Sequence, residues 1–298
     1  IRLEKPRGWG DVCWDPGAFI SVRIEDGDDV LVRQYSLVND SDGSGTMDIC
    51  VKRVPGGRVS NRLNDELDTG DYVTVLGPPV STGGLATPEV PARALFVAGG
   101  VGITPIISHL RRLARNGTAE DVVLLYFNHD RRSIIFQREI TELGSLPGIT
   151  VHVLAGLRPS PELLADLVPD AHDRETFACA PSGLVDALRG CLTAAGQAPE
   201  RLRTESFAAP ALDRAADDGS RYTVTFARSR RSVEVDGGTT LLEAANRVGI
   251  RVPTGCRSGL CRACVTPKLS GRTRGGGTAA DRITVCDSLP CSDIELDL

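Results

Sequence analysis

The sequence has no apolar run long enough to cross a membrane. Its longest stretch without a charged residue, 94–110, contains four glycine or proline residues and a histidine, whereas a membrane helix needs about 20 predominantly apolar residues. We therefore expect no contact with a membrane. The first residues already have the pattern of a strand, so we expect the first strand of this region to be missing before Ile1. The question of a targeting signal stays open.

The sequence also lacks the features of a nucleic-acid-binding protein and of a secreted disulfide-rich domain. Its formal net charge is −5, which gives no reason to expect a nucleic-acid partner. Its nine cysteines do not form a disulfide framework, because four of them cluster at the spacing of metal ligands. With 41% hydrophobic and 24% charged residues, the chain is typical of globular proteins. A reducing cytoplasm is the compartment we expect.

Four cysteines near the C-terminus carry the most specific pattern. Four residues separate Cys256 from Cys261, two separate Cys261 from Cys264, and Cys286 follows on a short apolar strand pattern. This is the ligand spacing of a plant-type 2Fe–2S cluster, in which thiolates hold two irons. A structural zinc site is the alternative, because paired cysteines also bind zinc. Zinc sites usually use two short cysteine pairs or cysteine/histidine mixtures, and no histidine follows His172, so the pattern favours the cluster.

Strand patterns and turn signals divide the chain into three blocks. Residues 1–91 alternate short apolar strands with Gly/Pro turns, which is typical of an antiparallel β-barrel or sandwich. Residues 92–208 alternate apolar strands with helical patterns, which predicts a doubly wound parallel α/β sheet. A linker at 209–220 is rich in alanine and aspartate. Residues 221–298 open with two strand patterns and a helix that leads into the cysteine loop.

Two turns at one edge of the predicted parallel sheet indicate a dinucleotide site. The strand 94–98 runs into a glycine-rich turn at 99–105, and a helix follows. Glycines at such a turn let a pyrophosphate approach the backbone and the positive end of the helix. A second strand ends in the same way at 179–183, with the sequence Cys-Ala-Pro-Ser-Gly. Each turn alone is also explained by packing, but two turns facing one crevice favour a bound dinucleotide.

A nucleotide site and a one-electron cluster in one chain require a converter between two-electron and one-electron transfer. Flavin is the usual converter. The strand pattern at 33–37 supplies Arg33 for a phosphate, Tyr35 to pack against an isoalloxazine ring, and Ser36 to bond its polar atoms. A Gly-Gly-Arg-Val-Ser turn at 56–60 offers a second phosphate site. Read alone, this strand pattern is also ordinary surface patterning.

Together these motifs resemble the ferredoxin–NADP reductase superfamily. Within it they are most similar to the phthalate dioxygenase reductase-like branch, whose domain order is flavin, NAD, then plant-type ferredoxin. The resemblance covers nearly the whole chain and includes Glu-Ser-Phe at 205–207 and the closing Glu-Leu-Asp-Leu at 295–298. It implies a multidomain fold with an antiparallel flavin β-barrel, a doubly wound NAD domain and an α+β β-grasp ferredoxin domain. It also implies that Cys286, rather than Cys291, is the fourth cluster ligand.

The resemblance assigns roles to individual residues. Those expected at the catalytic centre are Thr104, Cys179 and Phe207, the last lying against the flavin ring. The residues expected to bind flavin or nucleotide are Arg33, Tyr35, Ser36, Leu37, Lys52, Ser60, Gly99, Gly100, Gly102 and Asp130. The expected cluster ligands are Cys256, Cys261, Cys264 and Cys286. Ala180 stands where the family usually has glycine.

The function implied by the resemblance is an NADH-dependent reductase. It would pass single electrons through flavin and a 2Fe–2S cluster to a separate Rieske-type terminal oxygenase or demethylase. FMN is expected rather than FAD, although the turn at 58–60 also suits FAD. NADH is expected rather than NADPH, because Asp130 can bond ribose hydroxyls and repel a 2′-phosphate, while Arg131 and Arg132 suit that phosphate. The alternative is a redox-sensing or electron-storage module without an oxygenase partner.

Overall fold

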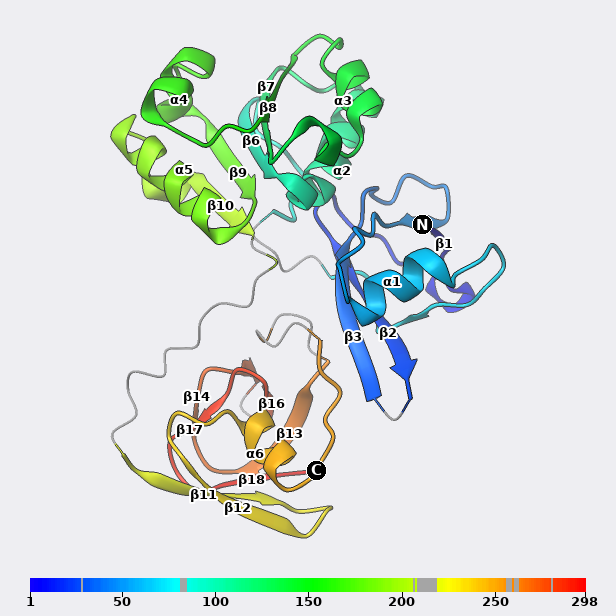
Figure 1. The fold of residues 1–298 in the computed structure, drawn as a ribbon, viewed down its shortest axis with the longest axis vertical. Coiled ribbons are helices and arrows are strands. Elements are labelled where there is room, and N and C mark those ends of the chain that lie inside the picture. Colours follow the sequence, from blue (N-terminus) through cyan, green and yellow to red (C-terminus); the bar gives the residue numbers. More distant parts are fainter. Residues whose placement is uncertain are drawn as a thin grey trace. The chain divides into compact units, whose positions relative to one another are not determined.

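The computed structural model describes residues 1–27, 29–80, 85–205, 207, 219–255, 259, 263–279 and 281–298, and Figure 1 shows the chain path. The chain divides into two compact units. Their residues are Ile1–Ile20, Tyr35–Asp71 and Gly77–Ala208 in the first, and Ser21–Gln34, Tyr72–Leu76 and Ala209–Leu298 in the second. No helix among the described residues has the length and apolar character of a membrane span.

Short antiparallel pairings characterise the first 80 residues. β1 pairs with β4 and β2 pairs with β5, both antiparallel, and β3 borders β2 on its other side. Isolated antiparallel bridges join Phe19 to Val80 and Leu37 to Ile49. This confirms the antiparallel fold expected for the flavin domain. Its elements are β1 (Arg2–Glu4), a 3₁₀ turn (Arg7–Trp9), β2 (Phe19–Asp26), β3 (Asp29–Ser36), β4 (Thr46–Asp48), α1 (Arg58–Asp65) and β5 (Thr74–Val75).

A five-stranded parallel sheet follows, in the order β10-β9-β6-β7-β8. The chain starts in the middle at β6, runs outward through β7 and β8, and then crosses to β9 and β10 on the other side. The order therefore reverses between β6 and β9, and ligands bind at such switch points in open α/β sheets. The strands are β6 (Arg93–Gly99), β7 (Asp121–Asn128), β8 (Ile149–Ala155), β9 (Glu175–Cys179) and β10 (Leu202–Glu205).

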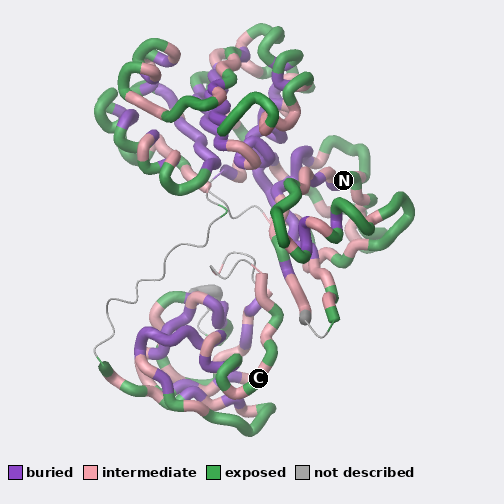
Figure 2. Tube along the Cα trace, viewed as in Figure 1, coloured by how far each residue is buried: buried purple, intermediate pink, exposed green. Residues whose placement is uncertain are grey.

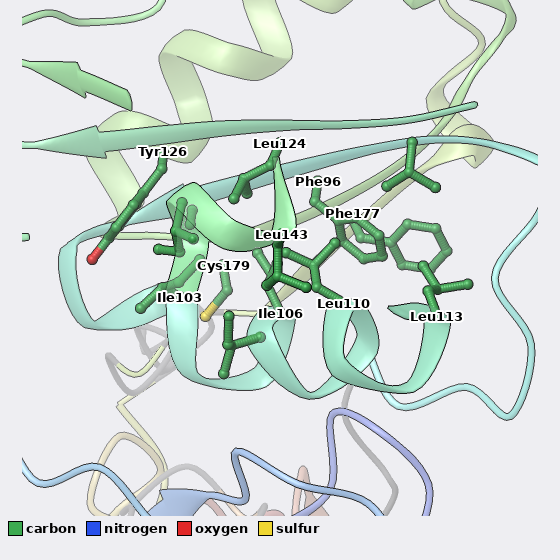
Figure 3. Close-up of a cluster of buried hydrophobic side chains, with 14 of the residues drawn as sticks. Phe96, Ile103, Ile106, Leu110, Leu113, Leu124, Tyr126, Leu143, Phe177 and Cys179 are labelled. Atoms are coloured by element: carbon green, nitrogen blue, oxygen red, sulfur yellow. The ribbon is translucent and has the colours of Figure 1, made fainter. Parts of the chain in front are cut away.

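Helices cover both faces of this sheet because successive strand residues point to opposite sides. On β6, Phe96 packs in the cluster with α2 and α3, whereas Leu95 and Val97 pack with α4 and α5. Figure 3 shows the first cluster, and Figure 2 shows the buried strands between the helices. The helices are α2 (Ile103–Asn116), α3 (Gln137–Leu143), α4 (Pro161–Leu167) and α5 (Ser182–Ala194), with 3₁₀ turns at Gly100–Gly102, Arg131–Ser133, Ala171–Asp173 and Pro199–Arg201. The doubly wound fold is confirmed.

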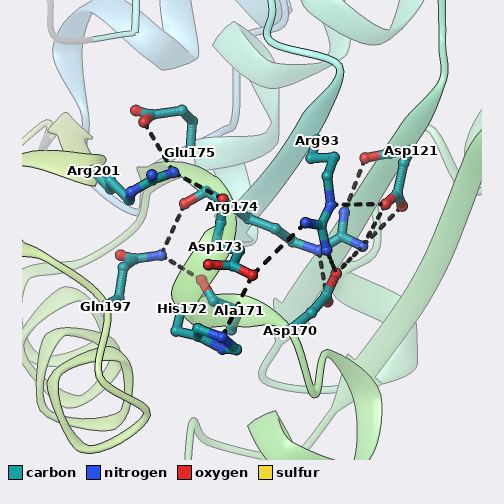
Figure 4. A network of polar contacts seen from close by, with 10 residues as sticks. All are labelled: Arg93, Asp121, Asp170, Ala171, His172, Asp173, Arg174, Glu175, Gln197 and Arg201. Carbon is teal, nitrogen blue, oxygen red and sulfur yellow. Dashed lines mark hydrogen bonds and ion pairs between the residues drawn. The ribbon is translucent and has the colours of Figure 1, made fainter.

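A network of charged side chains closes the edge of the sheet where β6, β7 and β9 begin, which we call the amino edge (Figure 4). Arg174 is only 5% exposed, and its guanidinium donates to both carboxylate oxygens of Asp121 at 2.8 and 2.9 Å and to Asp170 Oδ1 at 2.8 Å. Arg93 also pairs with Asp170. Since the buried guanidinium has several carboxylate partners, this edge is electrostatically satisfied.

The C-terminal region contains a mixed sheet in the order β12-β11-β18-β13-β16-β15. β11 and β18 are parallel, while β11–β12 and β13–β18 are antiparallel. α6 begins at a capping box in which Thr240 and Glu243 bond each other's backbone N–H. The elements are β11 (Arg221–Phe226), β12 (Arg231–Asp236), α6 (Leu241–Arg247), β13 (Val265–Ser270), β14 (Thr273–Arg274), β15 (Gly277–Ala279), β16 (Arg282–Thr284), β17 (Leu289–Pro290) and β18 (Ile294–Leu296).

Candidate functional site

The two turns expected to bind the nucleotide are in direct contact. A Cβ atom added to Gly102 would lie 1.9 Å from the backbone oxygen of Cys179, and one added to Gly99 would lie 2.7 Å from the Cβ of Ala180. No side chain fits at either position. Gly100 has a φ of 54° and open space around its Cα, so its backbone is accessible. We call this end of β6 and β9, with its two glycine-dependent turns, the carboxyl edge.

Side chains hold the glycine turn from within. The Thr104 hydroxyl donates to Val101 O at 3.0 Å, and the buried Tyr126 hydroxyl donates to Gly100 O at 3.1 Å. The same Tyr126 oxygen accepts from Ile135 N at 3.4 Å. Burial raises the pKa of Tyr126, so the hydroxyl keeps its proton. Thr104, expected at the catalytic centre, thus uses its hydroxyl to shape the turn, and its side chain is buried.

Cys179 and Glu205 lie side by side where β9 and β10 end. The Cys179 thiol is fully buried among the apolar side chains shown in Figure 3. Burial, followed by the charge of Glu205, raises its pKa well above the ordinary value. Burial also raises the pKa of Glu205 from 4.5 to about 7, and Glu205 Oε2 has no hydrogen-bond partner among the described residues. Phe207 is 53% exposed, and Ser206 lies outside the described residues.

The three polar residues of the expected flavin strand differ in their exposure to solvent. Arg33 is exposed and donates to its neighbour's carbonyl, Val32 O, at 2.8 Å. Tyr35 is half-buried, and Leu37 is fully buried. Ser36 is 5% exposed, and its hydroxyl has no partner among the described residues. An accessible guanidinium and an unpaired buried hydroxyl on one strand fit a ligand with a phosphate and a polar ring.

The second expected flavin turn is compact. Ser60 Oγ accepts from Val54 N at 3.2 Å, and a Cβ on Gly57 would lie 2.5 Å from that oxygen. A side chain at Gly57 would therefore displace the Ser60 hydroxyl where α1 begins. Lys52 is exposed just before the turn. Ser60 thus shapes the turn, while the backbone of the turn and Lys52 are what the chain offers to an anionic group.

Asp130 follows the second strand of the parallel sheet, β7, and caps a 3₁₀ turn. Its Oδ1 accepts from Ser133 N at 2.9 Å, and its own N–H donates to Ser133 Oγ at 3.3 Å. The hydrogen bond from Ser133, followed by one from His129, lowers the pKa of Asp130. The carboxylate is therefore charged and fixed in place. Arg131 and Arg132 are exposed next to it, without an ion-pair partner in the described part of the chain.

Two of the four expected cluster ligands can be placed. Cys264 and Cys286 are both buried in the C-terminal core, and their thiols interact, which raises the pKa of Cys286 together with burial. Gly259 N donates to Cys286 Sγ at 3.4 Å, the type of backbone contact that iron–sulfur ligands receive. These residues fit a cluster. Cys256 and Cys261 lie outside the described residues, and Cys291 is half-buried and absent from this core.

Three family models match successive parts of the chain. An oxidoreductase FAD-binding domain covers residues 3–82, an oxidoreductase NAD-binding domain 96–172, and a 2Fe–2S iron–sulfur cluster binding domain 224–291. A solved structure of phthalate dioxygenase reductase aligns over 100% of this chain and 92% of its own, with a TM-score of 0.61 and 28% identity. The chain belongs to the phthalate dioxygenase reductase-like branch. The family, the fold class and the oxidoreductase class expected from the sequence are confirmed.

Other relatives of this phthalate dioxygenase reductase-like chain align over nearly its whole length. An NADPH oxidoreductase of Mycobacterium tuberculosis is 32% identical over 98% of this chain and 78% of its own length. The glycine betaine monooxygenase reductase subunit of Pseudomonas aeruginosa is 28% identical over 95% of this chain and 86% of its own. A type IV self-sufficient cytochrome P450 monooxygenase aligns with a TM-score of 0.70 and 26% identity, but this chain spans only 39% of it. The reductase-like chain is therefore a flavin, pyridine-nucleotide and 2Fe–2S oxidoreductase.

Proposed function

We propose that the protein passes electrons from NADH, singly, to a separate Rieske-type terminal oxygenase or demethylase in the cytoplasm. The observation that carries this proposal is that one chain combines three features. They are a strand with a flavin-type motif, two nucleotide-binding turns in contact at the switch point, and a buried pair of cysteines. Bound flavin and cluster would supply the conversion from hydride to one-electron transfer. Relatives named as reductase components of glycine betaine and 3-ketosteroid monooxygenases support an oxygenase partner.

The chain's own residues provide binding and orientation. The open backbone at Gly100 and the start of α2 receive the nucleotide pyrophosphate, while Tyr126 and Thr104 fix that backbone. Ser36 and Arg33 bind the flavin, with Phe207 covering its ring. Cys256, Cys261, Cys264 and Cys286 hold the cluster. The domain boundaries we propose are 1–91, 92–208 and 221–298, joined by the linker 209–220.

The function is tested by anaerobic addition of NADH to the purified full-length protein. We expect the flavin and cluster absorbance bands to bleach, and cytochrome c to be reduced over many turnovers. Binding of NADH without turnover would instead identify a redox sensor. Cys286→Ser should remove the cluster while NADH still reduces the flavin, and Cys291→Ser is the matched control. Cluster loss in Cys291→Ser would reassign the fourth ligand.

We propose FMN as the flavin, by similarity to the phthalate dioxygenase reductase-like branch. Mass spectrometry of the cofactor released by denaturation decides between FMN and FAD, and an FAD mass contradicts the proposal.

We propose NADH as the electron donor because the charged Asp130, held by Ser133 N, follows β7, where the adenosine ribose is expected. The mycobacterial relative is named for NADPH, and the exposed Arg131 and Arg132 favour that nucleotide. Specificity constants for both nucleotides test the choice. Asp130→Asn should lower the preference for NADH, whereas Arg131→Gln should raise it. A higher constant for NADPH with the unmodified protein would reject the proposal.

A further inference from the structure

A buried carboxylate joins the helix that follows the glycine turn to the segment that follows the flavin strand. Asp40 is 1% exposed, and its Oδ2 accepts from Arg115 Nη2 at 2.7 Å and from Arg112 Nε. Burial alone would raise the pKa of Asp40, but the hydrogen bonds from Arg115 and Arg112 outweigh this effect and lower it. The carboxylate therefore stays charged between two guanidinium groups of α2.

Other contacts extend this connection along one face of α2. Gly17 N donates to Ser108 Oγ at 3.0 Å, and Arg111 Nη1 donates to Val38 O at 2.7 Å. Arg112 also pairs with Asp15 at 3.2 Å. Ser108, Arg112 and Arg115 follow the i, i+4, i+7 spacing of a single helix face. One face of α2 therefore makes these contacts, while the opposite face of α2 packs on the sheet.

Each half of the connection belongs to a short stretch that also carries a cofactor motif. Tyr35 and Ser36 end β3, and Asp40 follows four residues after Ser36. The glycine turn ends at Gly102, and α2 runs directly from it to Arg112 and Arg115. Leu37, between Ser36 and Asp40, forms an antiparallel bridge with Ile49, and α2 is continuous from the turn to Arg115. A shift at Asp40 therefore moves the nucleotide turn relative to the flavin strand.

We propose that Asp40, with Arg112 and Arg115, is a positioning residue for hydride transfer, which holds the nucleotide-binding turn at a fixed place against the flavin-binding strand. This inference rests on the proposed function. Hydride transfer needs the reacting atoms about 3–3.5 Å apart, and a misplacement of about 1 Å can slow a reaction roughly 100-fold. Asp40 is buried while Arg112 and Arg115 are partly exposed. Separation would leave the buried carboxylate unpaired, so the contact resists displacement.

The test compares Asp40→Asn, Asp40→Glu and a control, Glu142→Gln, by stopped-flow mixing of the full-length protein with NADH. Glu142→Gln removes an exposed ion pair with Arg138 on α3, away from the connection. We expect Asp40→Asn to lower the limiting rate of flavin reduction at least about tenfold with a smaller change in the NADH dissociation constant. Asp40→Glu should recover a substantial part of the rate, and Glu142→Gln should retain the full rate.

Flavin content and the rate of cluster reduction by dithionite should be equal in all variants, because these do not depend on the nucleotide turn. If Asp40→Asn does not fold, Arg115→Gln, which leaves the Arg112 contact in place, is measured instead and should lower the limiting rate about threefold. A limiting rate within twofold of the unmodified protein in the folded variant overturns the inference alone. If the unmodified protein binds flavin but neither NADH nor NADPH reduces it, the proposed function falls and the inference falls with it.

Discussion

The two edges of the parallel sheet contrast in how their polar groups are satisfied. At the amino edge, the buried Arg174 has carboxylate partners in Asp121 and Asp170 (Figure 4). At the carboxyl edge, Glu205 Oε2 is buried without a partner among the described residues, and backbone turns touch at distances that only glycine allows. The paired charges of the amino edge stabilise the fold. The unpaired carboxylate oxygen and the tight turns of the carboxyl edge cost stability, as is common at ligand-binding sites.

The largest effect is expected from Gly102→Ala, which breaks the contact at the carboxyl edge. The added methyl would lie 1.9 Å from Cys179 O, so the two turns must separate. We expect NADH-driven flavin reduction to fall by at least about 100-fold, measured by stopped-flow absorbance. Gly190→Ala is the control, since this exposed glycine of α5 has open space around it. In Gly190→Ala, NADH should reduce the flavin at the normal rate, and the stability should rise by ~0.5–1 kcal/mol. Equal rates of flavin reduction in Gly102→Ala and Gly190→Ala would contradict the role given to the contact at Gly102.

The amino edge should show the opposite profile in Arg174→Met. Removal of the guanidinium takes the buried partner from Asp121 and Asp170, which keep the more exposed Arg93. We expect a loss of about 3 kcal/mol in the free energy of unfolding. This value is at the low end for a buried pair because both carboxylates are partly exposed. Urea denaturation measures it. Arg138→Met, which removes an exposed pair, should leave the free energy of unfolding nearly unchanged, because solvent screens such a pair. A large fall in NADH affinity in Arg174→Met would contradict the division of roles.

Glu205→Gln should sharpen the comparison through its pH dependence. Burial raises the Glu205 pKa from 4.5 to about 7, so the folded protein favours the protonated acid. Ionisation therefore begins to cost stability as the pH rises above 4.5, and the full cost is present above about 7. We expect the variant to match the unmodified protein near pH 4 and to be more stable by roughly 2 kcal/mol above pH 7. Denaturant melts at several pH values measure the free energy of unfolding of both proteins. A difference that does not change with pH would contradict this prediction.

The smallest effect is expected from Tyr126→Phe. The change removes the hydrogen bond to Gly100 O but keeps the ring in the core. We expect a loss of ~1 kcal/mol in stability and a rise of about two- to threefold in the NADH dissociation constant. Thermal unfolding and NADH titration measure the two quantities. Unchanged NADH affinity would show that the turn keeps its shape without this bond.

Local patterns in the sequence were enough to predict the order and type of the domains. Alternating strands and helices identified the parallel sheet, and two glycine or proline turns after its strands identified the carboxyl edge. These predictions succeeded because strand periodicity and turn chemistry depend on neighbouring residues. The contact between Gly102 and Cys179 O then follows from the adjacency of β6 and β9.

Contacts between distant charges could not be predicted in the same way. Asp40 lies 72 residues from Arg112 and 75 from Arg115, and in the sequence all three have the pattern of a solvated surface. Nothing in the sequence around Arg174 indicated that its side chain would be buried. The sequence pointed to Thr104 and Ser60 as ligand contacts, which stays a prediction. It gave no sign of the hydrogen bonds by which their hydroxyls also shape their own turns. The one available signal for the Asp40 connection was the i, i+4, i+7 spacing of Ser108, Arg112 and Arg115.

The burial of Cys179 has a chemical consequence for an oxidoreductase. Oxidants attack the thiolate form of an accessible cysteine, and this attack leads through sulfenic acid to irreversible products. Cys179 is inaccessible, and its raised pKa keeps it protonated. Its backbone oxygen meanwhile forms the tightest contact with the glycine turn. Cys179, whose backbone contacts the glycine turn at the carboxyl edge, is therefore protected from oxidation at its thiol.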